Sequence, residues 1–532
     1  MFSIRRCHGP PCVGHPGPHP KTSVIPTPRR AKRGKEISGN PAFGTIKNQK
    51  WEARVDSRAR MPGMKLPQPF SWSREDARSG KFDGKFLIGV RTTGIYCLPS
   101  CPTHPPLAKN VTLYRTEAEC QAAGLRACKR CRPDLFYRGE DENIALYDGL
   151  IARVRAAPGD FTDAASLARA SGVSASKLGG LFRDHAHLAP AQWLRRERVR
   201  HAADLLLSGN DKVVEVGFAA GFESESVFHR QFLALTRMTP GAYRALSQVF
   251  LLQLPAGYRA QEILAYHTRD PESLCEKSEG NRIWKALLTP DGPAVLELSL
   301  EKEGAWARVH GPKRVGRATL SFLHDAALKM LGLYNEVTPF ETRHADLTAR
   351  RRGLRLPCIP TGFDGLCWGI IGQQINVKFA GSLRREIINL AGEKVGTMRT
   401  HPTPQKLADI GTAPLTKRRF SGSKAKYLMG AAQAVAKGEL DVEGLPRGSA
   451  IAAEKKMTAL HGVGVWTARY TMLRGGFADA APVGDSALAT ALQRLHKLPE
   501  RPDQAKTKEL MAIFSPHRSL ATAHLWNSLK DG

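Results

Sequence analysis

The chain has 532 residues, which suggests roughly three or four domains, and its 42% hydrophobic content is enough for several packed cores. Its 79 Lys and Arg outnumber its 49 Asp and Glu, which gives a formal net charge of +30. So large a surplus predicts a polyanionic partner, nucleic acid above all, and argues against a merely soluble basic protein. No run of about 18 apolar residues occurs, so we expect no transmembrane helix and no membrane partner.

The start of the chain is rich in Pro, Gly, Arg and Lys and lacks apolar periodicity. We therefore expect residues 1–65 to form a disordered basic tail. Because this segment is Arg-rich and acid-poor, it also resembles a transit peptide. A start codon assigned too early is at least as good an interpretation, with Met61 or Met64 as the real first residue.

A cysteine quartet is the most informative pattern in the chain. Within residues 70–140, four cysteines follow the spacing C-x3-C and C-x2-C: Cys97, Cys101, Cys128 and Cys131. Such thiolates close small chelate loops that suit one soft tetrahedral ion, zinc before others. Spacing alone favours a purely architectural site, because closed four-thiolate sites are usually structural. The remaining cysteines show no disulfide framework, which fits a reducing cytoplasm.

The segment that holds the quartet, including TTGIYCLPSCPTHPP and ACKRCRP, closely resembles the N-terminal domain of the bacterial Ada adaptive-response family. The resemblance implies that one zinc-bound thiolate removes methyl groups from DNA phosphates, and it assigns this role to Cys97. Methylation would remove one negative charge from the site and raise its affinity for DNA. Arg126, Lys129, Arg130 and Arg132 would bind phosphate, or they form only a solvated basic face.

Residues 141–246 are expected to be all-helical, with two similar halves. Gly172 marks the turn of the first half and Gly221 that of the second, and serines open the helix that follows each turn. Together with the sequence MTPGAYR, the halves resemble the AraC-type DNA-binding domain. Gly180 stands where this family often has an arginine in the recognition helix.

Different residues of the two halves are expected to form the core and to contact DNA. We expect the aromatic side chains of the second half to be buried: Phe222, Phe228 and Phe232. Polar positions on the second helix of each half are the candidate major-groove contacts, namely Ser176, Lys177, Glu225 and His229.

Residues 250–340 are predicted to be β-rich. Leucines at 296, 298 and 300 alternate with polar residues, which predicts a half-buried strand. After a turn at residues 302–304, residues 305–310 are expected to form the returning strand.

The final region, residues 345–532, is expected to be helical with Gly-rich turns. In LHGVGVWTARYTML, Gly462 and Gly464 form a tight turn between two helices, whose N–H groups can approach a DNA phosphate. Asp485 precedes a helix with three leucines on one face, and alone it is best interpreted as an N-cap. Those leucines are Leu488, Leu492 and Leu495.

The order of hairpin and Gly-Asp, with the GQQIN run at residues 372–376, resembles the helix-hairpin-helix DNA glycosylases and, among them, 3-methyladenine DNA glycosylase II. The resemblance implies that Asp485 stabilises the positive charge on the sugar of a flipped nucleotide. Glycosylases that also cut the strand carry a lysine where this chain has Trp466, so we expect simple hydrolysis of the glycosidic bond.

The same resemblance assigns further residues of the final region. Gln373 and Gln374 would contact DNA, with Gln374 in the gap left by the flipped base. Trp466 and His517 would line the substrate pocket, and His517 stands where a tryptophan often contacts the base. A monovalent cation at the hairpin turn is also implied.

We therefore predict a multidomain, mainly α protein. Its parts are a small zinc-bound α+β domain (70–140), an all-α double helix-turn-helix domain (141–246), a small β-rich α+β domain (250–340) and an all-α helix-hairpin-helix glycosylase domain (345–532). The predicted function is repair of alkylated DNA and its regulation in the bacterial cytoplasm, on double-stranded, alkylated and promoter DNA and with RNA polymerase as a further partner. The enzyme would be a monofunctional glycosylase, with 3-methyladenine as its first substrate.

Two other functions stay open. One is a transcriptional regulator whose glycosylase part is a non-catalytic DNA-binding relic. The other is a glycosylase whose N-terminal half only tethers it to DNA. A module for repair of O6-methylguanine is not expected, because the chain has no Pro-Cys-His-Arg run.

Overall fold

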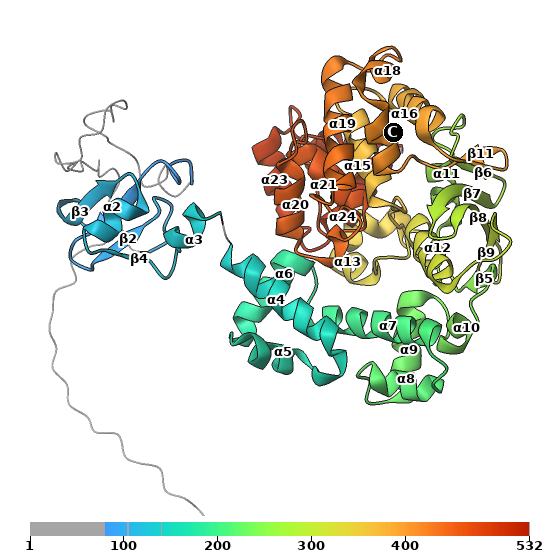
Figure 1. Ribbon diagram of the computed structural model, residues 1–532, viewed down its shortest axis with the longest axis horizontal. Helices are drawn as coiled ribbons and strands as arrows, with labels where there is room; N and C mark the ends of the chain where they lie inside the picture. The colour runs from blue at the N-terminus through green and yellow to red at the C-terminus, as the bar shows by residue number, and fades with distance from the viewer. Residues whose placement is uncertain (1–79, 104–105, 140, 531–532) are drawn as a thin grey trace, which may run out of the picture. The chain divides into compact units, whose positions relative to one another are not determined.

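The computed structural model describes residues 80–103, 106–139 and 141–530 (Figure 1). The predicted basic tail, residues 1–65, lies outside the described residues, as does the start of the predicted zinc domain. The chain divides into two compact units, residues 1–134 and 135–532. Within the described ranges, no helix combines the length and the apolar character that crossing a membrane requires.

The first unit is built on a four-stranded sheet with the strand order β3-β1-β2-β4. β1 pairs antiparallel with β2 and β3, whereas β2 pairs parallel with β4. Leu87, Tyr96 and Cys120 are buried in its small core. Its elements are β1 (Leu87–Val90), β2 (Ile95–Cys97), η1 (Ala108–Asn110), β3 (Val111–Tyr114), α2 (Glu117–Ala122) and β4 (Arg126–Ala127), and α3 (Pro133–Tyr137) contains the boundary between the units.

The second unit begins with helices that form two helix-turn-helix pairs, α5–α6 and α8–α9, joined by the long helix α7. Gly172 and Gly221 adopt left-handed backbone at the two turns, with φ of 68° and 88°. The three predicted core phenylalanines are at most 4% exposed, which confirms that they pack inside. The helices are α4 (Glu142–Ala156), η2 (Pro158–Asp160), α5 (Ala164–Ser171), α6 (Ala175–Ala186), α7 (Pro190–Ser208), α8 (Val213–Ala219), α9 (Glu225–Thr236) and α10 (Pro240–Arg244).

A five-stranded antiparallel sheet follows, with the order β5-β9-β8-β7-β6. The predicted hairpin is its β8–β9 pair, but β8 is not half-buried as expected. Its polar residues Glu297 and Ser299 are only 8% and 5% exposed, because Glu297 lies between Arg282 and His310 of the neighbouring strands, at 3.5 and 2.7 Å, and Ser299 donates to Glu301. The elements are β5 (Val249–Leu252), α11 (Ala260–His267), β6 (Glu276–Glu279), β7 (Arg282–Thr289), β8 (Gly292–Leu300), β9 (Ala305–His310), α12 (Arg317–Met330), β10 (Lys394–Val395) and β11 (Met398–Arg399).

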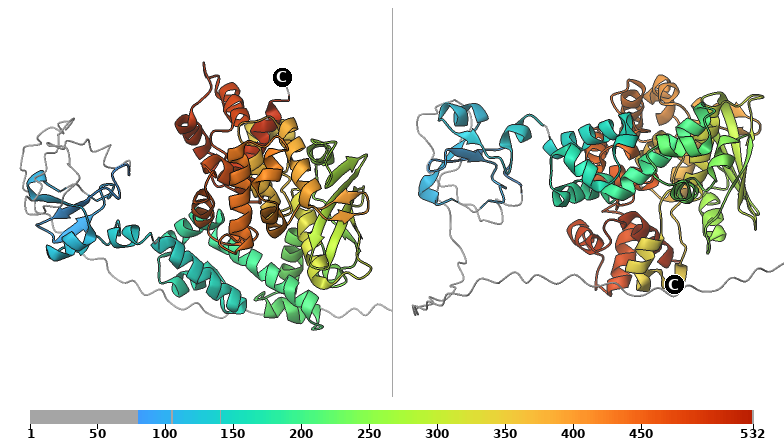
Figure 2. Two further views of the ribbon diagram at one scale, coloured as in Figure 1. Left: turned by 45° about the horizontal axis from the view of Figure 1, so that its top comes forward. Right: turned by 90° about the horizontal axis from the view of Figure 1, so that it is seen from below.

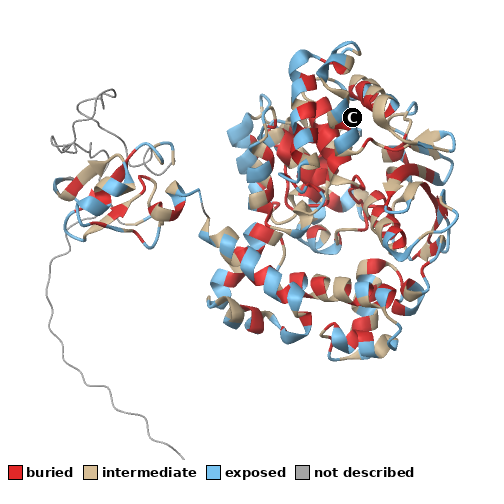
Figure 3. Cartoon of the chain, viewed as in Figure 1, coloured by how far each residue is buried: buried red, intermediate tan, exposed pale blue. Residues whose placement is uncertain are grey.

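The C-terminal helices surround α15, in which every residue after Gly362 is buried (Figure 3). Of the three leucines expected on one face of α22, Leu488 and Leu492 are fully buried but Leu495 is 45% exposed, because it lies in the last turn of that helix. The helices are α13 (Thr338–Arg343), α14 (Ala345–Thr348), η3 (Ala349–Arg351), α15 (Gly362–Ile371), α16 (Val377–Ala391), α17 (Pro404–Ile410), α18 (Thr412–Thr416), α19 (Gly422–Ala436), η4 (Leu445–Arg447), α20 (Ala450–Thr458), α21 (Val465–Arg474), α22 (Ser486–His496), α23 (Gln504–Ala512) and α24 (Arg518–Ser528).

Whereas the first helix-turn-helix pair has a core of its own, the second pair shares one hydrophobic core with the sheet. It runs without interruption from Val199 on α7, through Phe228 and Phe232 on α9, to Leu296 on β8 and Leu323 on α12. All views keep the green helices of this region beside the yellow-green sheet (Figure 2). A continuous core makes these two parts one folded body.

Candidate functional sites

The sheet of the first unit brings the cysteine quartet together. β2 and β4 lie side by side in parallel, so Cys97 at the end of β2 comes close to Cys128, which directly follows β4. The amide of Cys128 donates to the carbonyl of Tyr96 at 2.9 Å, which fixes this register. Cys101 and Cys131 lie in the loops that continue from the two strands.

The quartet has the chemistry and the size of a zinc site. The four sulfur atoms all lie within 4.8 Å of one another. A tetrahedral zinc ion with Zn–S bonds of about 2.3 Å places its sulfurs about 3.8 Å apart, so small adjustments suffice to bind it. Hydrogen bonds to Cys101 and Cys131 raise the pKa of Cys97. A bound cation would offset the negative charge of four thiolates this close together.

Cys97 differs from the other three sulfurs in its hydrogen bonds. Cys131 accepts the amide N–H of Leu98 and Cys128 accepts that of Arg130, both at 3.4 Å. Cys101 lies 3.1 Å from the hydroxyl of Thr103. Among the described residues, no donor outside the quartet reaches Cys97. Hydrogen bonds from outside the quartet therefore stabilise the charge of the other three thiolates but not that of Cys97.

Basic side chains predicted to bind phosphate surround this site. Arg126, Lys129 and Arg130 are all exposed, on β4 and in the loop between Cys128 and Cys131. Arg132, by contrast, pairs with Asp134 at 3.0 Å.

Of the four predicted major-groove residues, Ser176, Lys177 and Glu225 are exposed and His229 is half-buried. Ser176 and Lys177 occupy the first turn of α6, where the Lys177 ammonium donates to Asn143 at 2.6 Å. On α9, His229 and Glu225 form an i,i+4 pair at 3.8 Å.

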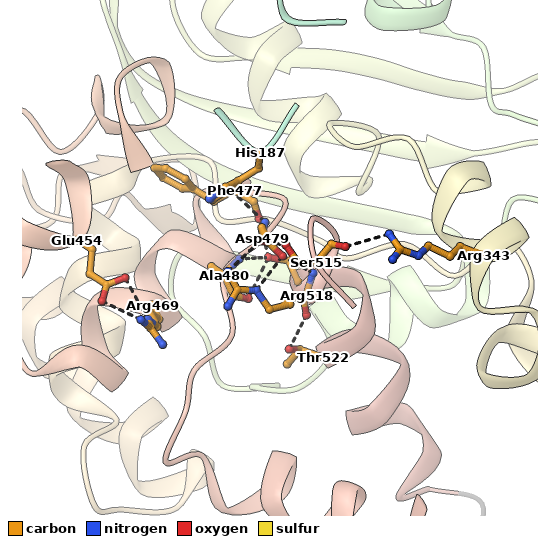
Figure 4. A network of polar contacts seen from close by, with 11 residues as sticks. His187, Arg343, Glu454, Arg469, Phe477, Asp479, Ala480, Ser515, Arg518 and Thr522 are labelled. Carbon is orange, nitrogen blue, oxygen red and sulfur yellow. Dashed lines mark hydrogen bonds and ion pairs between the residues drawn. The ribbon is translucent and has the colours of Figure 1, made fainter. Parts of the chain in front are cut away.

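The predicted hairpin joins α20 to α21, and the two glycines differ in their surroundings. Gly462 has φ of +83°, and a Cβ there would lie 2.1 Å from the ring of Tyr427. Gly464 has open space around it and opens α21 without any side-chain cap, so the first N–H groups of that helix are available to an anion. A bidentate ion pair between Arg469 and Glu454 clamps the two helices together (Figure 4).

A hollow of about 900 Å³ borders the hairpin and includes both predicted glutamines in its lining. The amide nitrogen of Gln373 donates to the carbonyl of Gly462 and to Thr467, both at 2.9 Å. Gln373 therefore supports the hairpin from behind, a task that sequence reasoning did not assign to it. Gln374 is exposed and has φ of 56°, an unusual conformation for a residue other than glycine, which presents its side chain on the surface.

Asp485 caps α22, as its sequence position predicts, and also makes a second contact. Its Oδ1 accepts the amide N–H of Leu488 at 2.8 Å and the indole N–H of Trp526 at 3.0 Å. Within the part of the chain that the structure describes, Oδ2 accepts no hydrogen bond. One oxygen thus orients the carboxylate, and the other is available to a substrate.

Aromatic side chains adjoin this carboxylate. Trp466 stacks on Tyr470, with ring centroids 5.5 Å apart, and Tyr470 lies 6.3 Å from Trp526. The hydroxyl of Tyr470 accepts the indole N–H of Trp368 at 3.0 Å. The sequence analysis assigned Trp466 but missed the other three. Tyr470 lies four residues after Trp466 on the same helix, a spacing that could have identified it, whereas Trp526 and Trp368 reach the site only through the fold.

The structure places His517 in a different cluster from the aromatic group beside Asp485. Its ring packs against Phe340 at 6.1 Å. It occupies the N-cap position of α24 without a side-chain capping bond, whereas Trp526 lies near the end of that helix. Burial lowers the pKa of His517, an effect that Asp479 opposes and that His344 and Arg343 reinforce. We predicted that His517 lines the substrate pocket. It could do so only if the substrate also reached the cluster around Phe340.

Comparison with known proteins identifies three parts of the chain. Residues 71–134 match the metal binding domain of Ada, residues 167–246 match a helix-turn-helix domain, and residues 367–516 match the HhH-GPD superfamily of base excision DNA repair proteins. The predicted multidomain, mainly helical architecture is confirmed.

Relatives extend over most of the chain. A probable bifunctional transcriptional activator/DNA repair enzyme AlkA from Mycobacterium tuberculosis H37Rv is 26% identical over 491 residues, which cover 85% of this chain and 95% of that protein. A DNA-3-methyladenine glycosylase from Bacillus subtilis is 27% identical over 54% of this chain and 99% of its own length. The bifunctional transcriptional activator/DNA repair enzyme Ada of Escherichia coli is 30% identical over 32% of this chain and 48% of its own.

Proposed function

Because the chain joins an Ada metal-binding domain, a helix-turn-helix domain and an HhH-GPD base excision repair domain, we propose that it repairs alkylated DNA and regulates that repair. The C-terminal domain hydrolyses the N-glycosidic bond of alkylated bases, 3-methyladenine first among them. The observation that carries this proposal is the carboxylate of Asp485, held through Oδ1 by Trp526 and by the start of α22 beside an aromatic group.

Each group of the site has a task in hydrolysis. As the base leaves, positive charge develops on the sugar, and the carboxylate of Asp485 stabilises that charge. An alkylated base that itself carries positive charge stacks favourably on the faces of Trp466 and Tyr470. Since a tryptophan occupies position 466, no amine is present there to form a Schiff base, and water completes the reaction.

DNA is held by the hairpin. The backbone N–H groups around Gly462 and Gly464 bind a phosphate, and a monovalent cation bound by carbonyl groups of the turn assists them. Gln374 fills the space left by the flipped nucleotide, since it is exposed on the rim of the hollow beside the hairpin.

The N-terminal domain accepts a methyl group from a DNA methylphosphotriester. Cys97, Cys101, Cys128 and Cys131 hold one zinc ion, which keeps the sulfurs deprotonated when it is bound. An electron pair of Cys97 forms the new bond to the methyl carbon, and the bond from that carbon to oxygen breaks and leaves its electrons on the phosphodiester. The absence of outside donors to Cys97 within the described chain supports this choice, because its electron pairs remain the most available.

Methylation then increases promoter binding, because it removes one negative charge beside the exposed Arg126, Lys129 and Arg130. The bound protein would recruit RNA polymerase in the bacterial cytoplasm, where thiolates remain reduced. Promoter affinity measured before and after reaction with methylphosphotriester DNA tests this switch, and equal affinities would refute it.

One experiment tests both activities at once. The purified protein is incubated with methylated duplex DNA, and the released bases and the modified cysteines are identified by mass spectrometry. We expect free 3-methyladenine and one methylated cysteine per molecule. Methyl transfer without base release would favour a regulator with a glycosylase relic, and base release without transfer would favour a glycosylase whose N-terminal half is a tether.

A further inference from the structure

Helix α6, the second helix of the first helix-turn-helix unit, ends against the C-terminal helices. Its last turn and its C-cap carry two buried histidines, His185 at 2% and His187 at 8% exposure. Nδ1 of His185 lies 2.7 Å from the hydroxyl of Ser449, the N-cap of α20, and so contacts the first helix of the hairpin. His187 contacts a different segment, the one that leads to Asp485.

That segment is fixed to the first turn of α24. The carboxylate of Asp479 accepts hydrogen bonds from the amide of Arg518 at 3.0 Å and from its guanidinium through two bonds of 2.8 Å (Figure 4). Ser515 donates to the same carboxylate at 2.8 Å. The hydroxyl of Ser519 donates toward the carbonyls of Phe477 and Ala480 and accepts the amide of Ala480.

The other end of this segment is also held by α24, because Trp526 on that helix donates to Asp485. Residues 477–485 are therefore attached to one helix at both ends. The backbone N–H of Asp479, a residue only 6% exposed, is not bonded to α24. It donates to Nδ1 of His187 at 3.3 Å, and the His187 ring packs edge-on against Phe477 at 6.2 Å (Figure 4).

His187 is suited to accept this hydrogen bond. Burial lowers its pKa to about 4, so the ring is neutral at physiological pH and Nδ1 keeps a free electron pair. Its backbone is left-handed, with φ of 57°, which ends α6 and turns the ring toward the C-terminal helices. Without the ring, a buried N–H beside the site would lack its partner.

We propose that His187, supplied by the first helix-turn-helix unit, is a positioning residue of the glycosylase that fixes residues 479–485 and thereby the carboxylate of Asp485. The inference rests on the proposed catalytic role of Asp485. The proposal also gives the first helix-turn-helix unit a task other than reading bases. This agrees with the presence of Gly180, which offers no side chain to the major groove.

Two substitutions separate positioning from packing. His187→Gly keeps the left-handed cap without strain but removes the acceptor. His187→Asn also tolerates left-handed backbone, and its side-chain oxygen can accept the same N–H. The matched control is Arg237→Gly. Arg237 is the left-handed C-cap of α9, with φ of 62°, and so occupies in the second helix-turn-helix unit the position that His187 occupies in the first.

The readouts are the single-turnover rate of 3-methyladenine release, affinity for abasic-site DNA and the unfolding midpoint, all in the full chain. We expect His187→Gly to slow base release at least tenfold with little change in affinity, since a displacement of about 1 Å can cost about a hundredfold in rate. His187→Asn should stay within about threefold of the parent, and Arg237→Gly should release base at the parental rate.

A His187→Gly protein that folds and keeps the parental rate, while Asp485→Asn is inactive, would overturn the positioning role alone. A parental rate for Asp485→Asn would overturn the proposed function and this inference with it. If His187→Gly does not fold, hydrogen exchange in the parent decides, because the proposal requires a protected Asp479 amide. Exchange there as fast as in an exposed loop would refute it.

Discussion

The indole N–H of Trp526 donates to Oδ1 of Asp485 at 3.0 Å, which joins the C-terminal helix α24 to the cap of α22. The two residues are 41 positions apart in the sequence. Through this contact a residue that would otherwise be only a helix cap becomes an oriented carboxylate beside an aromatic group. The contact leads directly to the first prediction.

Trp526→Phe keeps an aromatic ring and loses the donor. A hydrogen bond to a charged group contributes about 1.5–3 kcal/mol, so we expect base release to slow by roughly tenfold or more in single-turnover assays. Trp368→Phe is the control, because it removes an indole N–H of the same kind that donates to Tyr470 instead. Equal rates for the two variants would show that the bond to Asp485 has no special part in catalysis.

The hairpin glycines should separate stability from DNA binding. Gly462→Ala places a Cβ against Tyr427 in left-handed backbone, so we expect a loss of at least about 1–2 kcal/mol in the free energy of unfolding, measured with urea. Gly464→Ala meets nothing in the protein and should unfold like the parent, yet its methyl group obstructs the approach of a phosphate and should weaken binding to abasic-site DNA. Parental DNA affinity in Gly464→Ala would exclude phosphate contact at this position.

The quartet should hold about one zinc ion per chain, as a closed four-thiolate site requires. Cys101→Ser is expected to lose most of this metal in elemental analysis. Cys120→Ser is the control, since burial raises the pKa of Cys120 to about 12 and it lies outside the quartet in the core. Zinc retained in Cys101→Ser, or absent from the parent, would contradict the site.

Cys97 should receive one methyl group from methylphosphotriester DNA and keep it. Peptide mass mapping after the reaction is expected to find the modification on Cys97, whose sulfur receives no hydrogen bond from outside the quartet within the described chain. Methylation confined to Cys101, Cys128 or Cys131 would refute this assignment.

The sequence predicted most of the architecture because its signals are local. These signals are Gly172 and Gly221 at turns, Ser174 at a helix start, and the three leucines of β8 that face the core. They depend only on neighbouring residues and on periodicity. The burial of Glu297 was missed because it depends on its partners on the neighbouring strands, Arg282 and His310, and not on the alternation of residues within β8.

For the sites, too, the sequence predicted the residues of short motifs but not those that only the fold brings together. The positions of Cys97 and Asp485 follow from short motifs, and the structure brings the quartet together and places Asp485 at a helix start. Trp526 and His187 could not be predicted, since their partners lie 41 and 292 residues away. The core that the second helix-turn-helix pair shares with the sheet could not be predicted for the same reason: apolar periodicity shows which face is buried but not what covers it.

The single-turnover rate of 3-methyladenine release by Asp485→Asn tests the proposed glycosylase most directly. Asparagine caps a helix about as well as aspartate and can keep both hydrogen bonds at Oδ1, so the variant should fold and bind abasic-site DNA. It lacks the negative charge that stabilises the sugar, which is worth several kcal/mol and so a rate factor of about a thousand or more. A rate within about threefold of the parent, roughly 0.7 kcal/mol, would contradict the account and leave Asp485 as a helix cap.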